Sequence, residues 1–217
     1  RMKSEGNDRR GFLQQLMQAG AGTALLGGLG SGCRTRVPAC KSVPPNPFVE
    51  GGRPSLVSVE GEDLPAMMKA AGEVLGGFDK LRRLGSEAVL KGSYVQPQPY
   101  PVTTRADMIV AVSQVLKADG FARTTLFEAQ GSRLVAGFTT EANLRKVGVY
   151  EEVRRQGVEV LAADFLERDD FRLVRNPAWP IADAVAVHRA IHDAPVLVSL
   201  PLVKRHGSAR YTGALKI

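Results

Sequence analysis

Cationic and hydrogen-bonding side chains follow an apolar stretch near the end of the sequence. Residues 196–203 form this stretch, which leads directly into Lys204 and His206, with Thr212 and Lys216 close behind. A lysine supplies a full positive charge with three donors, and a histidine titrates near neutral pH. At the end of a buried strand, this pattern predicts an anion site. Lys204 and His206 would carry any catalysis there, with His206 as the proton-transfer group.

Polar residues also follow other segments that read as strands. Lys91, Glu128 and Asp164 each end such a segment, and Thr103 and Thr104 follow a proline-rich loop. If the strands are parallel, these residues lie along one edge of the sheet, where α/β proteins bind ligands. The lysines and threonines at this edge are expected to contact a carboxylate or phosphate. The alternative is that charged residues only mark where the chain enters solvent.

No metal centre is predicted. His188 and His192 are four residues apart, as two ligands on one helix face would be, but their segment reads equally well as a strand and no glutamate follows the first histidine. His206 with Glu128 or Asp164 would hold a divalent ion only weakly, because nearby lysines oppose a cation. We therefore expect substoichiometric transition metal, and we expect His188 to be a hydrogen-bonded residue on a half-buried element.

Motifs and composition exclude other classes of ligand. No G-x-x-x-x-G-K-[ST] sequence occurs and no G-x-G-x-x-G follows a strand, so neither a P-loop nor a dinucleotide-binding loop is supported. The net charge of +7 favours an anionic lipid or an anionic small molecule. Aromatic residues make up only 6% and do not interleave a basic run, so no nucleic-acid partner is expected.

Segments that read as strands alternate with segments that read as helices. The expected strands are residues 55–61, 87–93, 122–130, 158–164 and 196–203. The expected helices are residues 64–84 with a break at Gly76 and Gly77, 105–118, 141–146 and 150–156. Thr104 and Asp107 resemble a capping box that would open the second of these helices. The alternation predicts an α/β fold with a mostly parallel sheet and helices on both faces.

Residues 1–33 read as an export signal. Arg9 and Arg10 precede Phe-Leu and a short, glycine-rich apolar stretch, a pattern that resembles a twin-arginine signal. Such a signal implies that the twin-arginine export machinery carries the folded protein to the periplasm or the outer face of the membrane. The glycines argue against the alternative of an amphipathic helix of the domain. Residues 34–54 are proline-rich and read as a tether to a domain of residues 55–217.

Three fates of the signal fit the residues that follow it. Small residues precede Cys33, as where a bacterial lipoprotein is cleaved and lipidated. Cleavage after Ala39 is the second, and an uncleaved signal that serves as a membrane anchor is the third. All three place the domain outside the cytoplasm. Because Cys33 and Cys40 are the only cysteines, these residues cannot supply the four thiolates of an iron–sulfur cluster.

Two stretches resemble the domain of unknown function 362 family. They are GEVLGGFDKLRRLGSEAVLKGSYVQPQPYPVTTRADMIVAVSQVLKADGFARTTLFEA and VLVSLPLVKRHGSARYTGALK. The resemblance covers about residues 55–217 and includes the strand-end lysines, threonines and histidine. It departs from the family pattern at Gly92-Ser93, at Glu128-Ala129-Gln130 and at Ile217, beyond which the chain is expected to continue. The resemblance implies an α/β fold and a site at the strand ends, but no particular reaction.

Two functions fit these observations. The first is an exported, membrane-tethered α/β protein that accepts an anionic small molecule in a cleft at the strand ends. The second is a non-catalytic accessory subunit of a membrane redox complex, anchored by an uncleaved signal. The intact mass of the native protein, with any partners that co-purify, distinguishes them.

Overall fold

The computed structural model describes residues 44–129, 137–164, 168–176, 182, 184–206 and 210–213. These residues all belong to one compact unit, Pro38–Ile217. The predicted export and lipidation residues Arg9, Arg10 and Cys33 lie outside the described residues, as does Lys216. No helix within the described ranges is both long enough and apolar enough to cross a membrane.

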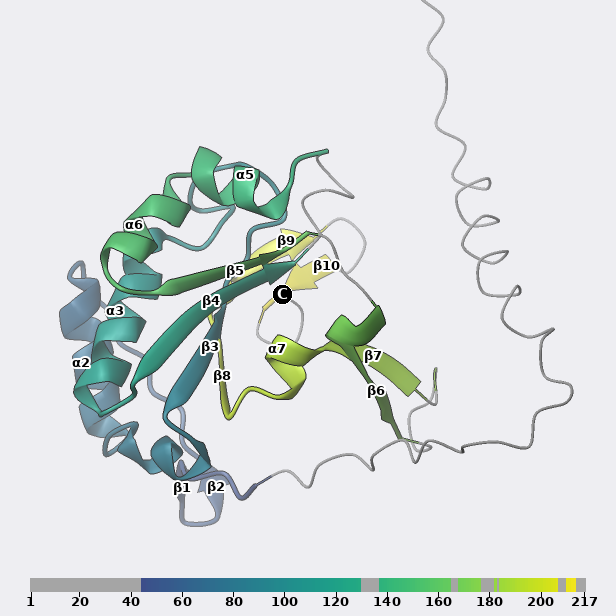
Figure 1. Ribbon diagram of the computed structural model, residues 1–217. Helices are drawn as coiled ribbons and strands as arrows, with labels where there is room; N and C mark the ends of the chain where they lie inside the picture. The colour runs from purple at the N-terminus through teal and green to yellow at the C-terminus, as the bar shows by residue number, and fades with distance from the viewer. Residues whose placement is uncertain are drawn as a thin grey trace, which may run out of the picture. The chain divides into compact units, whose positions relative to one another are not determined.

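A four-stranded parallel sheet is the main element of this unit (Figure 1). Its strands are β3 (Glu87–Lys91), β4 (Arg123–Ala129), β5 (Glu159–Ala163) and β8 (Val196–Ser199). Their spatial order is β5-β4-β3-β8, so the first three strands extend the sheet in one direction and β8 joins on the other side of β3. The parallel α/β sheet predicted from the alternating segments is confirmed.

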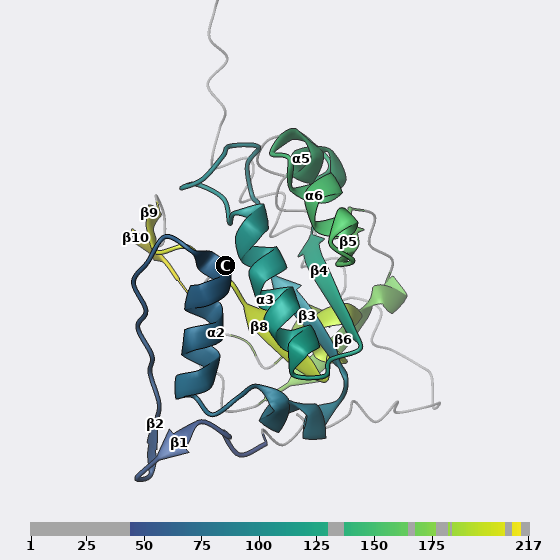
Figure 2. The ribbon, with the colours of Figure 1, turned by 90° about the vertical axis from the view of Figure 1, so that its left-hand side faces the viewer.

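Helices cover one face of the sheet (Figure 2). They are α2 (Leu64–Val74), α3 (Ala106–Ala118) and α6 (Val149–Arg155), with α5 (Thr140–Lys146) just before α6. Alternate apolar residues of the strands meet the apolar faces of these helices. The fully buried side chains of this core include Leu90, Ile109, Leu126, Leu144 and Val153.

Local chemistry sets the ends of α2. The side chain of Asp63 accepts a hydrogen bond from the N–H of Ala66 at 3.2 Å and so caps the start. Gly76 and Gly77 follow the helix with φ values of 73° and 85°, which only glycine adopts without strain. The predicted break at these glycines is confirmed, and a 3-10 helix, Asp79–Leu84, comes next.

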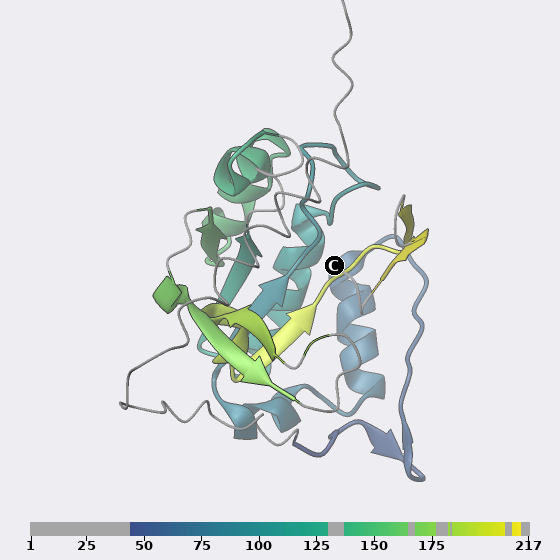
Figure 3. The same cartoon turned by 90° about the vertical axis from the view of Figure 1, so that its right-hand side faces the viewer.

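The opposite face of the sheet carries two antiparallel strands and a short helix (Figure 3). Strand β6 (Phe171–Arg175) pairs with β7 (Ala184–His188), and α7 (Arg189–His192) follows directly. The ring of His188 packs against that of Phe127 in β4, with centroids 4.8 Å apart. Helices on both faces were expected, but α7 is the only α-helix on this face among the described residues.

Short elements complete the described structure. Strand β1 (Val49–Glu50) pairs with β2 (Arg53–Pro54), and β9 (Lys204–His206) pairs with β10 (Arg210–Thr212), both antiparallel. A 3-10 helix, Arg168–Asp170, precedes β6. The pair β9–β10 follows β8 and carries the cationic residues singled out in the sequence.

The strand expected at residues 55–61 is not formed. These residues have no regular secondary structure, and Leu56 is almost fully exposed. Alternation of apolar and polar residues supplies a strand's side-chain pattern, but a strand also needs a neighbour for its backbone hydrogen bonds. Only Ser55 continues the β1–β2 pairing, through a bond from its N–H to the carbonyl of Phe48 at 2.9 Å.

Candidate functional site

A lysine and a buried glutamate form an ion pair where β3 and β4 end. The Nζ of Lys91 lies 2.8 Å from each carboxylate oxygen of Glu128 and also donates to the carbonyl of Gly92 at 2.9 Å. Glu128 is only 4% exposed. The structure therefore brings two of the predicted site residues together, and the negative charge of one offsets the positive charge of the other.

Burial controls the protonation of Glu128. It raises the pKa of Glu128 to about 7, although Lys91 and the N–H of Gly92 both favour the charged form. Burial also raises the pKa of the neighbouring Tyr94, and the charge of Glu128 raises it further. Glu128 can therefore exchange a proton near neutral pH.

Thr104 joins the ends of β3 and β8. Its hydroxyl accepts a hydrogen bond from the N–H of Ser93 at 3.0 Å and donates one to the carbonyl of Leu200 at 2.9 Å. The N–H of Leu200 in turn donates to the carbonyl of Lys91 at 2.8 Å. The side chain of Thr104 thus fixes the two chain segments that leave the sheet on either side of it.

Both threonines expected to contact a ligand donate to backbone carbonyls. Thr103 donates to the carbonyl of Gln98 at 2.7 Å. Thr104, engaged with β3 and β8, does not form the predicted capping box with Asp107. The N-cap of α3 is Arg105, whose side chain makes no capping bond, so no N-cap side chain accepts from the first-turn N–H groups of α3.

Lys204 reaches the end of β3 from β9. Its Nζ donates to Oγ of Ser93 at 3.1 Å and to the carbonyl of Val102. Thr212 lies opposite Lys204 in the β9–β10 register, is 2% exposed, and has no hydrogen-bond partner for its hydroxyl within the described part of the chain. His206 follows on the same face of β9, because side chains alternate along a strand.

These residues gather where the strand order reverses. Strands β4 and β5 lie to one side of β3, and β8 lies to the other. In open α/β sheets, ligands bind beyond the carboxyl ends of the strands at such a point. A small cavity of about 190 Å³ lies here, between the start of α3 and the end of β8, lined among others by Thr104, Arg105 and Ser199.

Asp164 has a different role from the other strand-end residues. It follows β5, and its carboxylate accepts hydrogen bonds from the N–H groups of Thr140 at 2.5 Å and Glu141 at 3.4 Å. These groups belong to the first turn of α5. Asp164 therefore stabilises the start of a helix, as a side-chain acceptor at that position does.

The two histidines four residues apart end different elements. His188 ends β7, and its Nδ1 accepts from the N–H of Ala190 at 3.1 Å, which confirms the prediction of a hydrogen-bonded, half-buried residue. His192 ends α7, with its Nδ1 2.6 Å from Oδ1 of Asp193. No group of three or more His, Cys, Asp or Glu side chains in the described ranges is arranged to hold a metal ion.

Gly92 and Ser93 are site residues that sequence reasoning misses, because it treats them only as departures from a family pattern. Ser93 is buried and contacts both Thr104 and Lys204. A Cβ at Gly92 would lie 2.4 Å from the ring of Tyr94, so a larger residue there would displace that ring. The one available signal is their position directly after the strand that ends in a lysine.

A family model described as domain of unknown function (DUF362) matches residues 89–217. The chain belongs to this family. The sequence resemblance suggests a start near residue 55, whereas the DUF362 match begins within β3. The match includes all the strand-end site residues and excludes the N-terminal segment. Neither a curated protein nor a solved structure matches the chain.

Proposed function

We propose that this DUF362 protein binds a small anionic molecule, with a carboxylate or phosphate group, at the sheet edge between β3 and β8. The observation that carries the proposal is the position of Lys204. Its ammonium group lies against the end of β3, and Thr212, whose hydroxyl is buried, pairs with Lys204 in the β9–β10 register. A cation and a buried hydroxyl group on paired strands can offer an anion both charge and a hydrogen bond.

The start of α3 adds positive character to this edge. Lys204 contacts the carbonyl of Val102, three residues before the N-cap Arg105. The first N–H groups of a helix carry partial positive charge and favour anions. The bonds of Thr104 to β3 and β8 would hold this helix start in place beside the ligand.

Lys91 has a second role in the proposal. While Glu128 is charged, the pair is neutral overall and Lys91 attracts an anion weakly. Protonation of Glu128 makes the charge of Lys91 available, and a pKa of about 7 means that this step needs little free energy near neutral pH. Anion binding would therefore be linked to proton uptake, with His206 as the proposed proton-transfer group.

Lys204→Met is expected to weaken anion binding roughly tenfold or more, because it removes a charge-assisted hydrogen-bond donor. Thermal unfolding is measured with phosphate, sulfate, citrate and acetate in turn. The wild-type protein should be stabilised by at least one of these anions, and the variant should lose that stabilisation while still unfolding cooperatively.

Lys69→Met is the matched control. Lys69 lies on α2 with a 76% exposed side chain, 3.9 Å from Glu73, and its loss should leave the response to anions unchanged. Because Lys204 also contacts Ser93 and Val102, unfolding without any anion is recorded to separate weaker folding from weaker binding. Equal anion-induced stabilisation in the wild type and Lys204→Met would refute the proposal.

We further propose that the domain is exported in folded form and held at the membrane. The support is the Arg9-Arg10 pair before Phe-Leu and the small residues before Cys33. The intact mass of the native protein tests this. A chain that begins at a lipid-modified Cys33 is a lipoprotein, an uncut chain in the membrane fraction is anchored, and a co-purifying redox complex supports the accessory role. An uncut chain in the cytosol would contradict export.

A further inference from the structure

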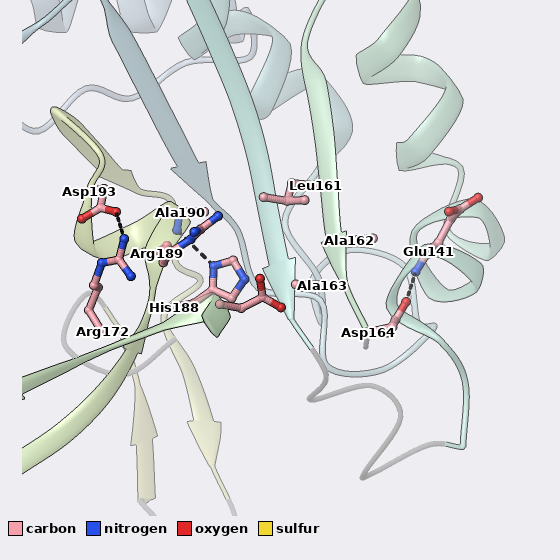
Figure 4. A pocket seen from close by; sticks show the side chains of 11 residues that line it. Glu141, Leu161, Ala162, Ala163, Asp164, Arg172, His188, Arg189, Ala190 and Asp193 are labelled. Atoms are coloured by element: carbon pink, nitrogen blue, oxygen red, sulfur yellow. Dashed lines mark hydrogen bonds and ion pairs between the residues drawn. The ribbon is translucent and has the colours of Figure 1, made fainter. Parts of the chain in front are cut away.

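A cavity of about 730 Å³ opens beside the end of β5 (Figure 4). One wall consists of β5, with Leu161 and Ala163. The facing wall comes from β6, β7 and α7, with Arg172, His188 and Arg189. Its volume is in the range of sites that hold small organic molecules.

Most carboxylates that line this cavity are engaged by the protein itself. Asp164 accepts from the first N–H groups of α5. Glu141 pairs with Arg145 at 2.8 Å, and Asp193 pairs with Arg172 at 3.6 Å. These three carboxylates therefore have partners within the chain, and Asp170 is the fourth carboxylate that lines the cavity.

Arg189 has no such partner. No hydrogen bond or ion pair holds its guanidinium within the described part of the chain, and the residue is exposed at the cavity wall. A guanidinium presents a planar fork of donors that matches a carboxylate or phosphate. Arg189 therefore offers a ligand a positive charge at this wall.

His188 is fixed in the same wall. Its Nδ1 accepts from the N–H of Ala190, and its ring packs against Phe127 at 4.8 Å and Phe171 at 5.9 Å between centroids. Burial lowers the pKa of His188, although the charge of Asp170 acts in the opposite direction. The lowered pKa favours the neutral ring. Because Nδ1 is an acceptor, the hydrogen of the neutral ring is on Nε2, which is then a donor.

We propose that this cavity is a second binding site, for a small organic anion whose carboxylate or phosphate pairs with Arg189 and accepts a hydrogen bond from His188. Leu161 is 40% exposed on the facing wall, so an apolar part of the ligand would cover it. The site goes beyond the anion site between β3 and β8, because its walls come from β5, β6, β7 and α7.

The test titrates the full chain with phenyl phosphate, benzoate and inorganic phosphate, followed by calorimetry and by NMR shifts of backbone amides. Phenyl phosphate or benzoate should shift the amides of α7 and of residues 161–164, and should bind more tightly than inorganic phosphate. Arg189→Gln should weaken this binding roughly tenfold, because it removes the charged fork. His188→Gln should also weaken it.

Two variants make the result specific. Arg155→Gln removes an exposed arginine that pairs with Glu152 on α6, and it should bind like the wild type. Lys204→Met should keep this binding even if the site between β3 and β8 binds nothing, so the two proposals fail separately. Equal affinities in the wild type and Arg189→Gln, no saturable binding of either organic anion, or the same amide shifts with magnesium alone would overturn the proposal.

Discussion

Replacing Lys91 by methionine is expected to lower the free energy of unfolding by about 3 kcal/mol at pH 8. Glu128 would stay buried without the ammonium group that lies 2.8 Å from both of its oxygens. A buried carboxylate without a counter-ion is strongly unfavourable, so the folded variant either retains that charge or takes up a proton at Glu128. Urea unfolding of both proteins measures the loss.

Two further measurements identify the cause as charge. The double variant Lys91→Met/Glu128→Gln should recover most of the loss, because a neutral amide replaces the carboxylate. The loss in the single variant should also shrink at pH 5, where Glu128 is protonated in the folded state. Should the loss be equal at both pH values and persist in the double variant, packing of the lysine chain would be its source.

The pH dependence of stability is the second large effect that we expect. The folded pKa of Glu128 is about 7, above its ordinary value of 4.5. Between these values the folded protein binds a proton that the unfolded chain does not. The contribution of Glu128 to the free energy of unfolding is therefore fully present below pH 4.5 and is lost as pH rises through 7. This difference corresponds to about 3 kcal/mol, measurable by urea unfolding from pH 4 to pH 8.

Glu128→Gln should flatten the stability profile by that amount. The variant keeps the shape of the side chain but removes its titration. Its free energy of unfolding should therefore increase relative to that of the wild type as pH rises. Glu87→Gln is the control, because Glu87 is a half-exposed glutamate that pairs with Arg123 at 2.6 Å. Its profile should parallel that of the wild type, whereas parallel profiles of the wild type and Glu128→Gln would exclude Glu128 as the source.

Features with a local cause could be predicted from the sequence. The alternation of strand and helix segments leads to a parallel sheet, and parallel strands end at one edge, which is why Lys91 and Glu128 meet. The break after α2 follows from the conformational freedom of Gly76 and Gly77. The segment around His188 reads as strand or helix, and the structure contains both, a strand to His188 and a helix after it.

The partners of polar side chains could not be predicted in this way. The sequence indicates that Thr104 caps α3, whereas its hydroxyl bonds Ser93 and Leu200, which only the folded sheet brings next to it. The sequence also does not indicate that Lys91 and Glu128 pair with each other, whereas the β3–β4 register brings them within 2.8 Å. Each hydrogen bond depends on distant segments, so the residue type alone does not determine it.

The pairing of β8 with β3 has a consequence for the order of folding. Ala88 lies opposite Val196, so this contact closes a very long loop, while β3, β4 and β5 are joined by much shorter connections. During synthesis, a chain that ends after β5 already contains Lys91 and Glu128 but lacks Leu200 and Lys204. The edge between β3 and β8 is therefore completed last, and a ligand that binds there would stabilise only the finished domain.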